Sequence, residues 1–291
     1  MKAPAFAYAR ATSVDGALEM LALHGEKAKL LSGGQSLLPA MNLRLISPEI
    51  VIDISDLAEL QGIEVRGGVL CIGALTRHAE LLASPQIGTF APLLAEAVRH
   101  VAHPAVRNRG TIGGSLAHAD PAAELPACMV ALDATIVARG QNGERRIAAA
   151  DFFRGIFATA LSADELLISV ELPIASRPSA YFFQEVARRH GDYALAGVAA
   201  HAIVNGQELS DLRMTFFAVA DRPVLAKAAS RLVSVAAAPG LIFDAAEAFG
   251  CELDPLDDQQ ASADLRRHLA KVLFRRCAVS LTGVGSAGMT S

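Results

Sequence analysis

The chain has 291 residues, which is enough for one large domain or for two to three smaller ones. Its net charge of −4 is spread over interspersed acidic and basic residues, which argues against nucleic acid or an anionic membrane as a partner. No apolar stretch approaches the roughly 20 residues that span a bilayer, and the first residues lack the hydrophobic region of a secretory signal peptide. We therefore expect a cytoplasmic protein without a membrane span.

The N-terminal residues predict a small α/β unit. Residues 13–24 have a helical apolar period, and Ser13 can cap the helix. Two short apolar runs, residues 28–31 and 50–54, predict strands, and the first run ends at a glycine-rich loop, residues 32–36. We therefore expect residues 1–56 to form one subdomain.

Residues 57–177 predict a second subdomain with two hairpins and a further strand that Pro173 stops. The segment 103–120 is rich in glycine, proline, asparagine and histidine. It is too irregular for a helix or strand, and we expect it to be the loop that carries the site. The predicted helices are 76–82 with Thr76 as cap, 92–101 and 122–132, and the predicted strands are 63–65, 69–72, 135–139, 145–147 and 166–172.

After about residue 177 the pattern changes to long strands followed by helices, which is typical of an α+β domain. We expect residues 178–291 to form this domain, with Asn205-Gly206 beginning the turn between its second and third strands. A stripe of Leu265, Leu269, Val272 and Leu273 marks the buried face of the last helix. The predicted strands are 181–187, 194–204 and 212–220, and the predicted helices are 223–233, 239–249 and 258–281.

Two loops, residues 30–37 and 109–116, each place a Gly-Gly pair beside hydroxyl residues. Glycine lets the backbone approach a ligand, and successive amides can form a concave nest for phosphate oxygens. Neither loop is a G-x-G-x-x-G or a G-x-x-x-x-G-K-[ST] motif, so neither a Rossmann site nor an ATP-type P-loop is predicted. Each loop alone is typical of an ordinary turn, but two of them could clamp the two phosphates of a dinucleotide from opposite sides.

The cysteines give no sign of a metal centre. Cys71, Cys128, Cys251 and Cys277 stand far apart without a C-x-x-C pair, so a zinc or iron–sulfur site of clustered cysteines is not expected. Isolated thiols in apolar surroundings are usually small core residues. If the protein belongs to a redox chain, other polypeptides must supply the metal centres.

Several motifs point to one family: residues 32–39 (SGGQSLLP), 48–54 (PEIVIDI), 107–124 (RNRGTIGGSLAHADPAAE) and 185–194 (EVARRHGDYA). With them the chain resembles the FAD-binding medium subunit of molybdenum hydroxylases of the carbon monoxide dehydrogenase and xanthine dehydrogenase type. The motifs cover most of the chain through about residue 200. The resemblance implies a two-subdomain flavin domain like that of vanillyl-alcohol oxidase and p-cresol methylhydroxylase. An α+β C-terminal domain with a three-stranded antiparallel sheet and helices would follow it.

The resemblance also implies roles for particular residues. Asp192 and Tyr193 would lie beside the isoalloxazine ring. Glu124 stands where relatives often have Asp, and Gln184 stands where some NAD-using relatives have Lys, which argues against NAD as the final acceptor. By contrast, we expect His100 and His103 to be loop or surface residues. The implied FAD-binding residues are Ser32, Gly33, Gly34, Gln35, Ser36, Leu37, Thr111, Gly113, Gly114, Ser115, His118, Asp120, Glu124, Leu167, Ile168 and Gln184.

The implied function is electron transfer within a complex. A large molybdopterin subunit would oxidise the substrate, a small subunit with [2Fe-2S] clusters would pass the electrons on, and the FAD of this chain would release them to an external acceptor. An (αβγ)2 assembly is the expected stoichiometry. Two alternatives stay open: a stand-alone FAD-dependent oxidoreductase of the same superfamily, and a non-catalytic scaffold that kept the fold.

Overall fold

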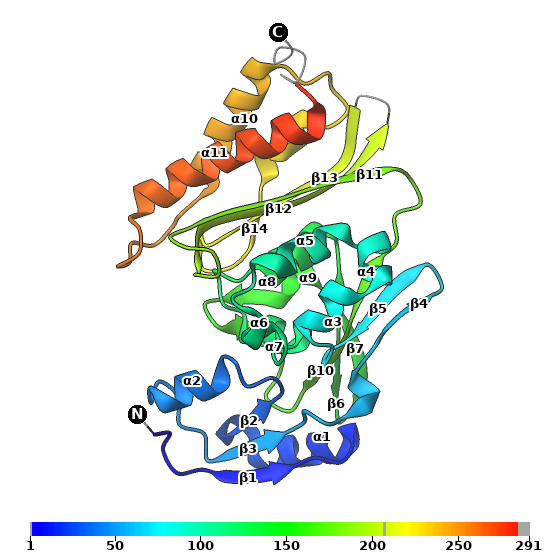
Figure 1. Cartoon of the computed structure of the whole chain (residues 1–291), viewed down its shortest axis with the longest axis vertical. Coiled ribbons are helices and arrows are strands. Elements are labelled where there is room, and N and C mark those ends of the chain that lie inside the picture. The colour runs from blue at the N-terminus through cyan, green and yellow to red at the C-terminus, as the bar shows by residue number, and fades with distance from the viewer. Residues whose placement is uncertain (1, 206–207, 285–291) are drawn as a thin grey trace.

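The computed structural model describes residues 2–205 and 208–284 and arranges them in three layers along the long axis (Figure 1). The N-terminal layer is a parallel sheet in the order β1-β3-β2, with the helix α1 packed against it. Ser13 caps α1 as predicted, since its Oγ accepts from the Gly16 amide. The sequence analysis missed the strand β1. The elements are β1 (Ala7–Arg10), α1 (Val14–His24), η1 (Gly25–Lys27), β2 (Ala28–Leu31), α2 (Leu37–Asn42), β3 (Ile50–Asp53) and η2 (Ala58–Leu60).

The middle layer is an antiparallel sheet in the order β4-β5-β10-β6-β7, and both predicted hairpins are present in it. Short helices pack against this sheet and bury its apolar face. The elements are β4 (Ile63–Arg66), β5 (Val69–Gly73), α3 (His78–Ala83), α4 (Pro85–Phe90), α5 (Pro92–His100), α6 (Pro104–Arg107), α7 (Ile112–His118), α8 (Glu124–Ala131), β6 (Thr135–Gly140), β7 (Gly143–Ala148), α9 (Ala149–Phe152), β8 (Phe153–Gly155), β9 (Ala158–Thr159) and β10 (Leu166–Pro173).

Two expectations for this layer are wrong. The segment 103–120 is not an irregular loop, because it forms the short helices α6 and α7, the second of which Thr111 caps through the Gly114 amide. Thr76 does not cap α3: its Oγ1 bonds to the backbone of Gly62 instead, and Arg77 is the N-cap. In the first case a capping threonine and short helices were mistaken for a loop because of the many glycines and prolines, and in the second the cap lies one residue after the predicted one.

The C-terminal layer is a sheet in the order β11-β12-β13-β14 that lies between two sets of helices (Figure 1). One face packs on α5 and α8 of the middle layer, and the other face packs on α10 and α11. The turn predicted to begin at Asn205-Gly206 falls on residues 206–207, which lie outside the described residues. The elements are β11 (Ser179–Ala187), β12 (Ala194–Asn205), β13 (Glu208–Phe217), β14 (Val224–Leu225), η3 (Lys227–Leu232), α10 (Pro239–Glu252) and α11 (Ala263–Thr282).

The helix predicted at 223–233 is also wrong, because tertiary contacts override its local pattern. Val224 and Leu225 pair with β13, and the Glu252 carboxylate accepts hydrogen bonds from the Lys227 and Ala228 amides where η3 begins. A backbone that pairs with a sheet edge and then turns onto a carboxylate cannot continue as one α-helix.

The last helix begins later than predicted, and its buried face is only partly the predicted one: Leu273 is buried and Leu269 packs against the core. The helix is capped by Ser262, and the predicted stripe residue Leu265 is 41% exposed. Its buried face includes Arg266, because the guanidinium donates to the carbonyls of Leu195 and Ala218 and to the Asp258 carboxylate. A buried charge with all these partners is tolerated where an unpaired one is not. None of the described helices is long and apolar enough to span a membrane.

We predict that Phe249→Ala lowers the free energy of unfolding by about 3–5 kcal/mol, measured by chemical denaturation. Phe249 is fully buried and its ring lies 4.2 Å from Phe216 and 5.5 Å from Phe274, so truncation leaves a cavity at the centre of this core. Phe243→Ala on the same helix is the control: its side chain is 50% exposed, and a change of about 0.5 kcal/mol is expected. Equal losses in both variants would contradict this packing.

Candidate functional site

The two glycine loops meet between the N-terminal and middle layers. A hydrogen bond joins them there, although its two residues are 79 positions apart in the sequence. Thr111 Oγ1 donates to Ser32 Oγ at 3.2 Å. A Cβ on Gly33 would overlap the carbonyl oxygen of Arg109, and one on Gly114 would lie 2.8 Å from the hydroxyls of both Ser32 and Thr111. The glycines therefore allow two backbone segments to touch where any side chain would hold them apart.

The first loop leaves its amides free for a ligand. The amides of Gly33, Gly34, Gln35 and Ser36 make no hydrogen bond to a described residue. Gly34 has a φ of 71°, a left-handed conformation of the kind that occurs in anion-binding nests of successive amides. The Gln35 side chain braces the loop by donating to the Gly33 carbonyl at 3.1 Å. Four successive free amides form a cradle that fits the oxygens of a diphosphate.

The second loop is built differently from the expected amide clamp. The amides of Ile112 and Gly113 donate to the carbonyls of Thr76 and Ala74, at 3.0 and 2.8 Å. The Gly114 and Ser115 amides donate to the Oγ1 and carbonyl of Thr111. The prediction that this loop offers main-chain amides is therefore wrong for residues 112–115, and only the Thr111 amide makes no hydrogen bond to a described residue. The rest of this backbone is bonded within the middle layer, so the loop can offer the Thr111 amide, hydroxyl groups and a firm wall for the first loop.

A buried histidine supports this wall from behind. His78 is 5% exposed, its amide donates to the Gly110 carbonyl, and its ring lies against Gly110. Neither ring nitrogen makes a hydrogen bond of good geometry with a described residue. Burial lowers the pKa of His78 to about 4, so the ring is neutral at physiological pH. The sequence analysis did not single out His78, and nothing in its local sequence marks it.

Beyond the other end of α7 lies a pocket of about 290 Å³, and of the two predicted ring-side residues Tyr193 lines it while Asp192 does not. Asp120 and Tyr193 line it, and the Asp120 carboxylate accepts from the Ala122 amide at 2.9 Å. Tyr193 is 66% exposed, and Asp192 is also exposed. His118 ends α7, and its ring lies 4.8 Å from that of Phe157. A seven-residue helix thus links the glycine loops to this pocket.

Three further predicted cofactor contacts lie at different distances from the glycine loops, namely Leu37, Leu167 and Ile168. Leu37 is half-buried at the start of α2, directly after the free amides. Ala74 donates to the Ile168 carbonyl and accepts from Gly113, so Ile168 lies one residue away from the second loop. Leu167 is 4% exposed and its side chain belongs to the core of the middle layer.

Among the predicted cofactor contacts, the Gln184 side chain lies on the face of the C-terminal sheet that packs on α10 and α11, away from the glycine loops. It pairs with Val198, whose side chain packs in the core with α10 and α11. Its neighbour Glu185 faces the opposite way, toward α5, where its carboxylate lies 3.4 Å from His100 Nδ1. Because side chains alternate along a strand, a shift of one residue reverses the face. Glu185 and His100 are residues that the sequence analysis missed or assigned to the surface.

Glu124 begins α8 next to these residues. Burial, together with the nearby charges of Glu185 and Asp120, raises its pKa to about 7, although a hydrogen bond to its own backbone and the charge of His100 act in the opposite direction. The side chain is therefore a weak acid inside the domain junction and not an ordinary surface carboxylate.

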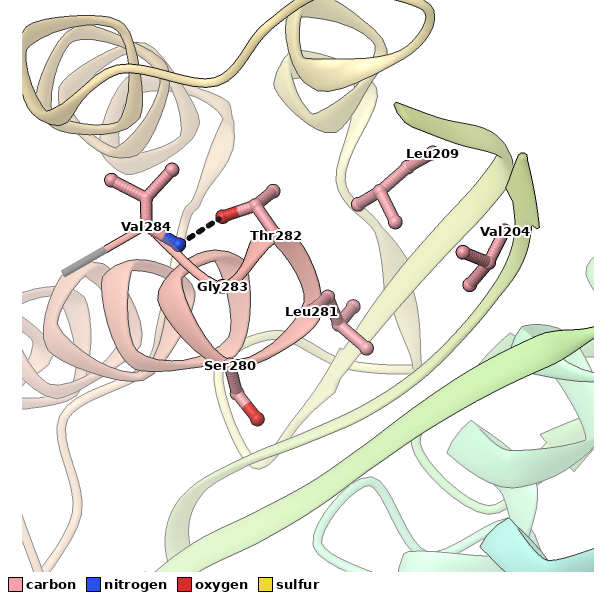
Figure 2. A pocket seen from close by; sticks show the side chains of 7 residues that line it. All are labelled: Val204, Leu209, Ser280, Leu281, Thr282, Gly283 and Val284. Atoms are coloured by element: carbon pink, nitrogen blue, oxygen red, sulfur yellow. Dashed lines mark hydrogen bonds between the residues drawn. The ribbon is translucent and has the colours of Figure 1, made fainter. Parts of the chain in front are cut away.

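A larger pocket of about 550 Å³ lies at the far end of the C-terminal layer (Figure 2). The end of α11 and two strand residues line it, and Val284 donates there to Thr282 Oγ1 at 3.4 Å. None of the predicted site residues borders this pocket, so we assign the site to the glycine loops. The lining residues are Val204, Leu209, Ser280, Leu281, Thr282, Gly283 and Val284.

Comparison with known proteins identifies the class. Residues 4–175 match the family described as the FAD binding domain in molybdopterin dehydrogenase, and residues 181–281 match the carbon monoxide dehydrogenase flavoprotein C-terminal domain. The chain therefore belongs to the FAD-binding medium subunits of molybdenum hydroxylases, which are oxidoreductase flavoproteins.

Individual relatives agree with this assignment over nearly their whole length. The alpha subunit of the 6-hydroxypseudooxynicotine dehydrogenase complex of Paenarthrobacter nicotinovorans is 39% identical, with 95% of this chain and 94% of the relative covered. Carbon monoxide dehydrogenase from Hydrogenophaga pseudoflava superimposes with a TM-score of 0.94 at 36% identity, covering 97% and 99% of the two chains. Quinoline 2-oxidoreductase from Pseudomonas putida 86 gives 0.91 at 38% identity, with the same coverage.

We predict that Gly33→Ala weakens FAD binding by about 100-fold or more, which corresponds to about 2.7 kcal/mol. The new methyl group would meet the backbone carbonyl of Arg109, so the two loops must separate. Gly114→Ala should lose less affinity, because its methyl group meets hydroxyls and the Ser32 hydroxyl can rotate away. Fluorescence titration of FAD measures both. Gly88→Ala, on an exposed helix with open space around it, is the control and should bind as the parent does.

We predict that His78 makes the fold acid-sensitive. Its pKa is about 4 in the folded chain against about 6.5 when unfolded, so the unfolded state binds more protons as the pH falls. The contribution of His78 to the free energy of unfolding is fully present above about pH 6.5. As the pH falls to 4, the free energy of unfolding decreases by about 3 kcal/mol because of this residue. Denaturation midpoints of His78→Gln against pH should lack this component. His268→Gln, at an exposed position, should retain it, and two parallel curves for parent and His78→Gln would refute the assignment.

Proposed function

We propose that this chain is the electron-transfer subunit of a molybdenum hydroxylase. In this proposal it receives electrons from [2Fe-2S] clusters of a small subunit and releases them to an external acceptor. The observation that carries the proposal is the junction of the two glycine loops, with four free amides on one side and a backbone wall on the other. FAD, when bound, supplies the chemistry of accepting and releasing one or two electrons. The chain's own residues need only hold and position it.

The first loop would bind the diphosphate. The amides of Gly33, Gly34, Gln35 and Ser36 point at it as neutral donors, so no lysine or arginine is required to balance the charge. The hydroxyls of Ser32, Ser36, Thr111 and Ser115 add further donors around it. Gly113 and Gly114 act through their small size, since they let α7 approach Ala74 and Ser32.

The other predicted contacts extend along α7 toward the pocket. His118, Asp120 and Glu124 would follow the cofactor from its phosphates toward the ring, with Ile168 behind the second loop. Asp192 and Tyr193 would stand at the ring, where Tyr193 is free to cover one face. We do not retain Gln184 as a cofactor contact, and Leu167 would contribute only through core packing.

An exposed apolar rim surrounds this pocket and supports contact with a partner subunit. Ile156, Phe157, Tyr193 and Leu256 are 48%, 58%, 66% and 57% exposed. Neighbouring exposed aromatic and aliphatic side chains are typical of an interface. We infer that the iron–sulfur subunit docks on this rim, where its clusters come within electron-transfer reach of the ring.

The test is purification of the complete chain with and without its co-expressed neighbours. The proposal predicts FAD at one equivalent, reduction by a reduced [2Fe-2S] partner in stopped flow, and recovery of a complex with a molybdopterin subunit. Turnover of a small organic substrate by the isolated chain would favour the stand-alone oxidoreductase instead. A chain that binds no FAD under any condition would favour the scaffold.

A rim variant provides the matched control for the partner. Phe157→Ser should slow reduction by the iron–sulfur subunit while reduction by dithionite keeps the rate of the parent chain. Phe243→Ser removes an equally exposed aromatic residue, 50% against 58%, from the opposite face of the C-terminal layer, and should change neither rate. Equal slowing by both reductants in Phe157→Ser would contradict docking at the rim.

A further inference from the structure

A group of ionisable side chains lies where the middle layer meets the C-terminal sheet. Glu185 on β11 is 6% exposed at its side chain, and its Oε1 lies 3.4 Å from Nδ1 of His100 at the end of α5. Glu124 opens α8 close enough to interact electrostatically with both. We refer to Glu124, Glu185 and His100 as the junction cluster.

The junction cluster has too few hydrogen bonds to stabilise all three side chains in their charged forms. Glu185 Oε2 is buried and has no hydrogen-bond partner among the described residues. Two carboxylates and one imidazole therefore share a poorly solvated space, which favours keeping one proton among them. Burial is the main cause that raises the pKa of Glu124 to about 7, and the interaction in which His100 donates to the Glu185 carboxylate raises the pKa of His100. Such interacting groups titrate as a unit.

The charged groups around the cluster come from every element packed on it. On α5, Glu96 Oε1 lies 3.9 Å from His100 Nε2 and also pairs with Arg99. From the segment after β11, the His190 ring lies 6.0 Å from that of His100. β12 places the uncharged Gly197 opposite Glu185. Asp120 acts on Glu124 from the side of the pocket.

The cluster joins the solvent to the pocket of the proposed ring site. His100 is 29% exposed at its side chain, so protons can enter there. Glu124 comes two residues after Ala122, which lines the pocket together with Asp120 and Tyr193. Burial raises the pKa of the Tyr193 phenol, and the charges of Asp120 and Glu124 raise it further. A change of charge in the pocket therefore shifts the pKa of Glu124.

We propose that the junction cluster is a redox-linked proton site: it takes up one proton from solvent when the flavin beside it becomes negatively charged. This inference rests on the proposed function. The balance is FAD plus cluster carboxylate plus two electrons plus two protons, giving FADH⁻ plus cluster carboxylic acid. The electrons come from the iron–sulfur donor and both protons come from solvent. The O–H bond forms on the cluster and breaks again when the flavin is reoxidised.

The first test needs no flavin. In the full chain labelled with ¹³C-carboxyl glutamate, NMR titration should show a carboxyl group with a pKa near 7 that disappears in Glu124→Gln. Glu185→Gln removes a neighbouring negative charge and should lower this pKa, whereas His100→Gln removes a positive charge and should raise it. Glu19→Gln, on the exposed face of α1, is the control and should change nothing. Absence of these opposite shifts would overturn the cluster as a coupled unit.

The second test measures the midpoint potential of bound FAD against pH. The parent should gain one proton per two electrons below about pH 7 and two protons per two electrons above it, which gives a break in the slope. Glu124→Gln should show one proton per two electrons throughout. If that variant retains too little FAD, Glu185→Gln should move the break to lower pH and His100→Gln to higher pH. An unchanged break in every variant would overturn the proposal. A parent chain that binds no FAD would instead sink the proposed function and leave the NMR result standing.

Discussion

The contact between Gly33 and the carbonyl of Arg109 is the constraint on which the arrangement of the site depends. The loops of a parallel sheet and an antiparallel sheet meet there, and they can touch because Gly33 has no Cβ that would overlap the backbone carbonyl of Arg109. The contact holds the first loop in a conformation that leaves its amides without internal acceptors. Unpaired amides are costly in a folded chain unless water or a ligand satisfies them. The proposed flavin site therefore depends on the close approach of the two layers.

The two loops divide the work unequally. The backbone amides of the first loop make no hydrogen bond to a described residue. Four amides of the second loop donate to Ala74, Thr76 and Thr111, and these bonds hold that loop in place. His78 fills the space behind it with a neutral ring.

The C-terminal sheet connects this site to the rest of the molecule. Its two faces belong to different cores, one shared with α5 and α8 and the other with α10 and α11. Adjacent residues on β11 therefore have different roles: Gln184 packs toward α11, whereas Glu185 reaches His100 and the neighbourhood of Glu124. Placing a weak acid and its neighbours at this boundary couples the charge of the flavin pocket to a proton site that opens to solvent through His100.

The sequence by itself determined the α+β class, the helix capped by Ser13, both hairpins and the glycine loops, because local periods, turn residues and capping hydroxyls act over a few residues. It also carried the family resemblance. Only the tertiary structure decided that the amides of residues 112–115 in the second loop are already used, that residues 223–233 are not an α-helix, and that Glu185 rather than Gln184 faces the junction. These features depend on partners dozens of residues away, and on which face of a strand is covered, and no local pattern encodes either.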